Sequence, residues 1–154
     1  MFSIELKGFD DLQDNINAII EVIKHPKNVF EFAKNAMYQD VIKHFDNTES
    51  PQGQWQWFSP TTISMKINQG KWPAKLLQDT GKLRAIVKEH TDNYAAVGTN
   101  LQTQKYGRMQ NYGGDTKMFG KHEVTIPSRE FMWLSDEAKG RILNQFVIAL
   151  KEAS

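Results

Sequence analysis

Two long stretches near the start of the chain repeat their apolar residues at the spacing of a helix. Residues 10–24 and residues 27–44 each carry an apolar residue every three to four positions, which is the pattern of an amphipathic helix. Pro26 separates the stretches, because proline disfavours the helical conformation in the residue before it. We expect two helices that pack as an antiparallel pair.

A third long helix is predicted over residues 135–151. Ser135 is a favourable N-cap, and two acidic residues in the first turn complement the helix dipole. We expect the apolar face of this helix, which includes Phe146, to cover the core of its own domain. Shorter helices are predicted over residues 60–67, where proline occupies the first position, and over residues 106–112, where two glycines follow.

The pattern changes to that of β-strands in the middle of the chain. Residues 83–98 place β-branched and aromatic residues on both sides of the polar bend at residues 91–93, which predicts a hairpin. Residues 122–126 form a further candidate strand that could join this hairpin. The resulting fold class is α+β, with two N-terminal helices and a C-terminal helix packed on a small antiparallel sheet. Residues 1–154 suit a single domain.

Composition narrows the possible functions. The chain has 19 Lys and Arg against 18 Asp and Glu and contains no cysteine. A charge so close to zero supplies no long-range attraction to nucleic acid or to anionic lipid. The absence of cysteine excludes thiolate catalysis and cysteine-ligated zinc. No apolar run is long enough for a signal peptide or a membrane span, so we expect no membrane contact.

Recognisable catalytic chemistry is missing from the sequence. The four histidines, at positions 25, 44, 90 and 122, have no second histidine at the i, i+4 spacing of a helical zinc site. Nucleophile elbows, Walker loops and dinucleotide-binding glycine motifs are absent as well. Loop carboxylates such as Asp79 and Asp115 have no base or nucleophile at an interpretable spacing. We expect no enzyme, no cofactor and no metal.

A basic and aromatic grouping in residues 55–88 supports two interpretations. It interleaves three tryptophans with six cations, namely Trp55, Trp57 and Trp72 with Lys66, Lys71, Lys75, Lys82, Arg84 and Lys88. Aromatic rings beside cations can stack bases and pair with phosphates, which would make this a nucleic-acid-binding module. Alternatively, the tryptophans are core or subunit-contact anchors and the cations form their solvated rim. The near-neutral charge favours the second interpretation, and steeply salt-dependent DNA binding would favour the first.

Several segments, taken in order along the whole chain, resemble the phage virion morphogenesis family. That family includes the tail completion proteins of contractile-tailed phages of the Mu-like kind. The segments are His44-Phe45, Pro51 to Gly53 with Trp55, Thr61-Thr62 with Lys66, Leu77 to Leu83, Val97 to Asn100, Tyr106 to Gly114 and Ile126 to Phe131. The sequence departs from the family's frequent histidine at Gln110 and frequent proline at Glu130.

The resemblance implies a structural role in the virion. It predicts a ring of subunits at the neck, which completes the tail and enables stable head–tail joining. The implied partners are copies of the chain itself, head connector or head-closure proteins, and tail terminator or tail tube proteins. The implied location is the neck or tail of the virion, and the host cytoplasm during assembly.

Aromatic loops are the candidate subunit contacts. Residues 50–59 and 106–119 combine aromatic with small residues and can order against a neighbour on assembly. Arg129 could hold a carboxylate or backbone oxygens of the adjacent subunit, or could form an internal salt bridge. The candidate interface residues are Trp55, Trp57, Tyr106, Tyr112, Arg129 and Phe131.

Overall fold

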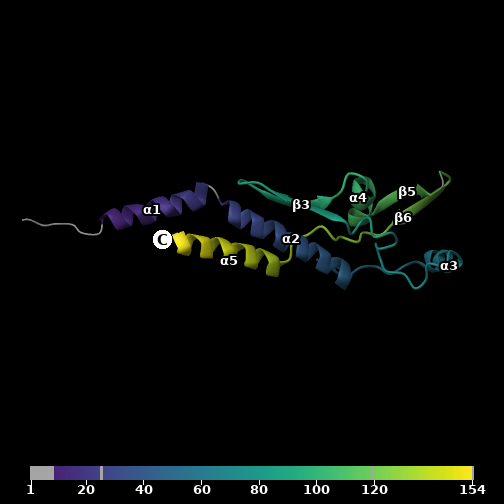
Figure 1. Cartoon of the computed structure of the whole chain (residues 1–154). Coiled ribbons are helices and arrows are strands. Elements are labelled where there is room, and N and C mark those ends of the chain that lie inside the picture. The colour runs from purple at the N-terminus through teal and green to yellow at the C-terminus, as the bar shows by residue number, and fades with distance from the viewer. Residues whose placement is uncertain (1–8, 25, 119, 154) are drawn as a thin grey trace, which may run out of the picture.

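The fold mixes five helices with six short strands in the described residues of the computed structural model, which are 9–24, 26–118 and 120–153 (Figure 1). The elements are α1 (Phe9–Lys24), α2 (Lys27–Asn47), β1 (Glu49–Ser50), β2 (Gly53–Gln54), α3 (Pro60–Asn68), β3 (Ile86–His90), β4 (Ala95–Thr99), α4 (Gln104–Tyr112), β5 (Gly114–Met118), β6 (His122–Ile126) and α5 (Asp136–Ala153). The predicted α+β class is confirmed.

The strands form three separate antiparallel hairpins instead of one sheet. β1 pairs with β2, β3 with β4, and β5 with β6. The predicted hairpin over residues 83–98 is confirmed, with Ile86 opposite Thr99 and His90 opposite Ala95. The expectation that residues 122–126 join this hairpin was wrong, because β6 pairs with the strand immediately before it in the sequence, β5. A tight local turn makes that neighbour the easier partner.

The helix that packs against α1 is α5, although α2 was the expected partner. α5 packs against both α2 and α1 and runs back along them (Figure 1). α1 and α2 follow one another around Pro26 and do not fold back as an antiparallel pair. The prediction that residues 10–24 and 27–44 pack as an antiparallel helix pair was therefore wrong. The apolar stripe of α1 is covered in part by α5, which arrives from the other end of the chain.

The compact core surrounds the second half of α2. Its buried members are Val41, Phe45, Trp55, Leu76, Leu83, Ile86 and Phe131. Phe45 is fully buried and meets the ring of Trp55 edge-on at 5.8 Å and the ring of Phe131 at 5.0 Å. Edge-to-face contacts of this kind add to the stabilisation from apolar burial. Five separate segments of the chain thus meet at one point.

Local signals set the helix ends as the sequence predicts. The Ser59 hydroxyl accepts the Thr62 amide hydrogen bond at the start of α3, and the Ser135 hydroxyl accepts that of Ala138 at the start of α5. Gly113 ends α4 with φ of 70°. A Cβ at Gly113 would lie 2.7 Å from the carbonyl oxygen of Ile126, so glycine also permits the close approach of β6 to this helix end.

Candidate assembly surface

The segment that precedes α5, residues 128–132, is held in place by the buried side chain of Asn111. Asn111, at the end of α4, is 3% exposed, and its Oδ1 accepts hydrogen bonds from the backbone amides of Phe131 and Met132 at 3.0 and 2.9 Å. The backbone carbonyl of Asn111 accepts a hydrogen bond from the Ser128 hydroxyl at 2.8 Å. A buried polar group of this kind is stable only when its bonds are made. The amide therefore fixes the segment against α4.

Arg129 lies within this segment and contacts the loop that carries Trp55 and Trp57. Its Nε donates to the carbonyl of Gln56 at 2.9 Å, and its terminal nitrogens lie 3.5 Å from the carbonyl of Trp57 and from the Oε1 of Gln110. Burial lowers the pKa of the guanidinium, although arginine stays protonated at neutral pH. The structure gives Arg129 internal hydrogen-bond partners, which are backbone carbonyls and a side-chain amide oxygen instead of the carboxylate of the expected salt bridge.

Trp55 and Phe131, two of the six candidate interface residues, lie in the chain's own core. Trp55 is 6% exposed, and its indole nitrogen donates to the carbonyl of Glu130 at 3.1 Å. Phe131 is fully buried against Phe45. Both side chains are already packed within the chain. The surface that a neighbour can reach must be supplied by other residues.

Trp57, Tyr106 and Tyr112 supply such a surface, since each keeps more than half of its side chain accessible. Trp57 and Tyr106 line one hollow of about 320 Å³, and Arg129 is also among its lining residues. Partial burial raises the pKa of Tyr106, so its hydroxyl is neutral at physiological pH. Trp57 also contacts Phe58 edge-on at 5.3 Å. Exposed aromatic rings of this kind are common anchors at protein interfaces.

The cations of residues 55–88 are largely engaged within the chain. Lys66 and Lys71 both bind Asp79, at 2.9 and 3.3 Å. Arg84 binds Asp46 at 2.7 Å. Lys88 donates to the side-chain oxygen of Asn35 and lies over the ring of Tyr38 on α2. Cations that already have partners are poorly placed to neutralise phosphates, so this arrangement favours the contact-anchor interpretation of the grouping.

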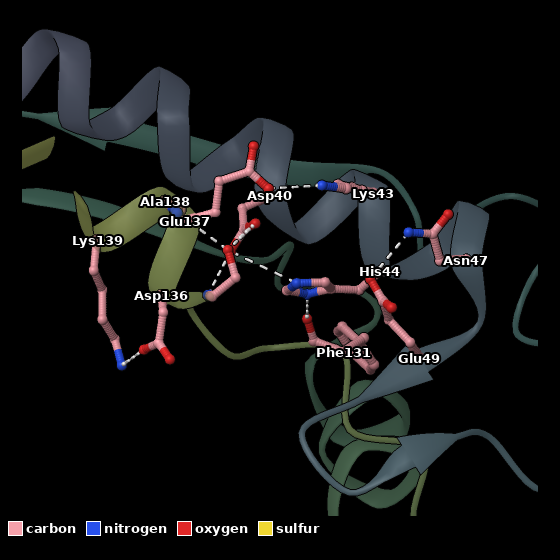
Figure 2. A network of polar contacts seen from close by, with 11 residues as sticks. Asp40, Lys43, His44, Asn47, Glu49, Phe131, Asp136, Glu137, Ala138 and Lys139 are labelled. Atoms are coloured by element: carbon pink, nitrogen blue, oxygen red, sulfur yellow. Dashed lines mark hydrogen bonds and ion pairs between the residues drawn. The ribbon is translucent and has the colours of Figure 1, made fainter. Parts of the chain in front are cut away.

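A second network ties α2 to the start of α5 (Figure 2). The carboxylate of Asp40 accepts hydrogen bonds from the backbone amide and the hydroxyl of Ser135, at 2.7 and 2.6 Å. Asp40 is 7% exposed. At the edge of the network Lys43 binds Glu137 at 2.9 Å. The carboxylate thus joins two helices that are remote in the sequence and complements the amino end of α5.

His44, fully buried beside Asp40, is the least satisfied polar group of this network. Its Nδ1 lies 3.1 Å from the carbonyl of Phe131 and must carry the proton to donate there. Its Nε2 is 3.6 Å from the Asp40 carboxylate, too far for a good hydrogen bond. The ring stacks on Trp133 at 3.9 Å. Among the described residues, His44 Nε2 and Trp133 Nε1 are buried without hydrogen-bond partners.

Asp40 and Asn111, two residues that organise this region, were not singled out from the sequence. Asp40 and His44 are one helical turn apart and interrupt the apolar face of α2, and this was an available signal. Asn111 had no comparable signal, because its partners are backbone amides twenty residues away. Only the tertiary structure brings them together.

In the described structure, buried polar side chains such as Asn111 hold backbone segments in place. Several aromatic side chains, such as Trp57, reach the surface. In the described part of the chain, no three His, Asp or Glu side chains are grouped to hold a metal. No described helix combines the length and the apolar character needed to cross a bilayer.

The chain belongs to the phage virion morphogenesis family, whose model matches residues 8–151, nearly its full length. The predicted family membership is confirmed. No individual curated protein and no solved structure matches the chain at a significant level. Family membership assigns the chain a structural or assembly role in a phage virion.

Proposed function

We propose that this protein completes the phage tail and enables stable head–tail joining, as a ring of subunits at the neck. The proposal rests on family membership together with one structural observation. Trp57, Tyr106 and Tyr112 are exposed, and Arg129 donates hydrogen bonds to the backbone carbonyls of Gln56 and Trp57, which hold the loop that carries Trp57. Aromatic anchors on a preorganised support lose little conformational entropy when a partner binds.

The proposed partners are other copies of the chain, a head connector or head-closure protein on one side, and a tail terminator or tail tube protein on the other. Assembly takes place in the host cytoplasm, and the finished protein stays in the virion. The role requires neither a catalytic centre nor a cofactor. Trp57 is the side chain we assign to a partner contact, because it is large, 53% exposed and lines the same hollow as Tyr106 and Arg129.

Deletion of the gene from an otherwise intact phage tests the proposal directly. We expect filled heads and separate or defective tails in electron micrographs, because a joining component acts after both structures are built. Purified protein added to such a lysate should restore infectious particles. A deletion phage with normal titre and normal joined particles would refute the proposed role.

Complementation with surface variants then tests the proposed contact. Trp57→Ala should lower the restored titre at least about tenfold, which is the size of effect expected for an aromatic interface anchor. Trp57→Phe should keep most of the activity, since it retains a ring. Tyr94→Ala is the matched control, because Tyr94 is a similarly exposed aromatic residue on the β3–β4 turn. Equal losses for Trp57→Ala and Tyr94→Ala would remove Trp57 from the contact.

A further inference from the structure

The two helices α1 and α5 form an arm that extends from the rest of the molecule (Figure 1). α1 packs against α5, and α5 continues along α2 towards the core. We call α1 together with α5 the helical arm. A pair of helices buries only one side of each member, so any further apolar surface on either helix is left for another partner.

The helical arm carries a high proportion of the exposed aliphatic side chains. On α1, Ile16, Ile20 and Ile23 are 47%, 38% and 58% exposed and follow the i, i+4, i+7 spacing of one ridge. On α5, Leu143 is 65% exposed. Within the described part of α5, only Ala138 is fully buried. The arm is thus amphipathic in sequence but only half covered in the folded chain.

A groove beside this arm is almost entirely apolar. It has a volume of about 390 Å³ and is lined by residues from the start of α2 and from α5. Pro26 and Phe30 line one wall, and Leu143 and Phe146 line the other, with Lys139 as the one charged side chain among its lining residues. Its walls offer contacts to aliphatic side chains and almost no hydrogen-bonding groups.

The total surface of the chain is larger than that of a compact monomer of the same mass. The chain exposes 11148 Å², whereas a compact monomer of its 17.7 kDa mass exposes about 8,000 Å². The eleven residues outside the described part could add at most about 1,800 Å² as fully extended chain. An excess of about 1,300 Å² remains, more than the roughly 800 Å² that each partner buries in a standard stable interface.

We propose that the helical arm is a contact surface for a second copy of this chain. The isoleucine ridge of α1 lies on the arm, and the apolar groove lies between α5 and the start of α2, so a second copy supplies the counterpart that each of them lacks. A contact between the ridge of one copy and the groove of the next joins two different surfaces, and this head-to-tail type of contact generates a ring when the rotation between copies closes. The inference rests on, and deepens, the ring assembly proposed above.

Site-directed crosslinking in assembled particles tests the contact, because the chain contains no cysteine. Particles are built from a mixture of two single-cysteine variants, Ile16→Cys and a size-tagged Leu143→Cys, and treated with a short bismaleimide. We expect a mixed dimer of the two variants. Leu101→Cys replaces Leu143→Cys in the control, because Leu101 is 91% exposed and lies outside the arm. The mixed dimer should be at least about fivefold weaker with this control.

Two crosslinking outcomes would overturn the inference. One is attachment of the Ile16→Cys variant to a cysteine of a different polypeptide of the particle and not to its own kind, which would assign the arm to another neck or tail protein. The other is a mixed-dimer yield no higher than that of the Leu101→Cys control. In that case the arm does not face a neighbouring copy.

A charge placed on the arm provides a second readout. Leu143→Glu should reduce the number of copies incorporated per particle at least about tenfold, since a buried unpaired carboxylate is strongly unfavourable. Its thermal melt should be unchanged, because the side chain is exposed in the single chain. Leu101→Glu is the matched control. Normal incorporation of Leu143→Glu would refute the arm contact while leaving the head–tail joining role intact, whereas normal joining in the deletion phage would refute that role whatever the crosslinks show.

Discussion

The core around α2 and the helical arm contrast in how well each satisfies its apolar residues. Around α2, Phe45, Leu76 and Phe131 are at most 1% exposed, and they come from segments far apart in the sequence. On the arm, Ile23 and Leu143 remain more than half exposed although they lie on regular helices. The comparison shows that a regular helix forms in this chain whether or not its apolar side chains are buried. The core is completed within one copy, whereas the arm leaves apolar side chains exposed that a neighbouring copy covers in the proposed assembly.

Removal of the aromatic side chain of Phe45, at the centre of the core, should have the largest effect on stability. Phe45→Ala removes a fully buried ring that contacts Trp55 and Phe131, and it should lower the free energy of unfolding by about 3–5 kcal/mol. Urea denaturation of the purified protein measures the change. Leu143→Ala on the arm should change it by less than about 0.5 kcal/mol. Comparable losses for the two variants would abolish the contrast between the regions.

The connection between the two regions should be next in size. Asp40→Ala removes the acceptor of two Ser135 hydrogen bonds and should cost about 1.5–3 kcal/mol, as expected for bonds to a charged group. Ser135→Ala should cost about 1 kcal/mol, because it removes the N-cap of α5 and one of these bonds. Urea denaturation followed by far-UV circular dichroism checks both. An Asp40→Ala variant as stable as the parent would show that the arm is held by packing alone.

Phe146 lies at the boundary of the comparison. The sequence predicts that its face of α5 belongs to the domain's own core, but in the structure the side chain is only half-buried and lines the open groove. We therefore expect Phe146→Ala to destabilise the single chain by about 2 kcal/mol, roughly half the cost of a fully buried phenylalanine. A thermal melt measures the loss. A cost as large as that of Phe45→Ala would place Phe146 in the core after all.

The smallest expected effect is electrostatic and belongs to the loop beside the core. Hydrogen bonds from Lys66 and Lys71 hold the pKa of Asp79 below its ordinary value. A lowered pKa stabilises the fold above the ordinary pKa of aspartate, and the contribution is lost as the pH falls through the lowered pKa. Because the carboxylate is half-exposed, we expect less than about 1 kcal/mol. Asp79→Asn should remove this part of the acid sensitivity, measured by urea denaturation between pH 7 and pH 3.

The sequence by itself determines the local structure of this protein. The ends of α3 and α5 follow from Ser59 and Ser135, whose hydroxyls bond to amides three residues away. The β3–β4 hairpin follows from β-branched and aromatic residues on both sides of a polar bend, and α4 ends at a glycine with positive φ. Each of these features depends only on residues within a few positions, so pattern and propensity are sufficient.

The tertiary structure decides which apolar residues are buried and what each element packs against. Trp55 and Trp57 alternate with glutamines in the same short segment, yet Trp55 is 6% exposed and Trp57 is 53% exposed. Their difference arises because Glu130 and Phe45, remote in the sequence, surround only the first ring. The choice of α5 as the partner of α1 has the same origin. Burial depends on which distant segments arrive at a residue, and the spacing of its near neighbours does not contain that information.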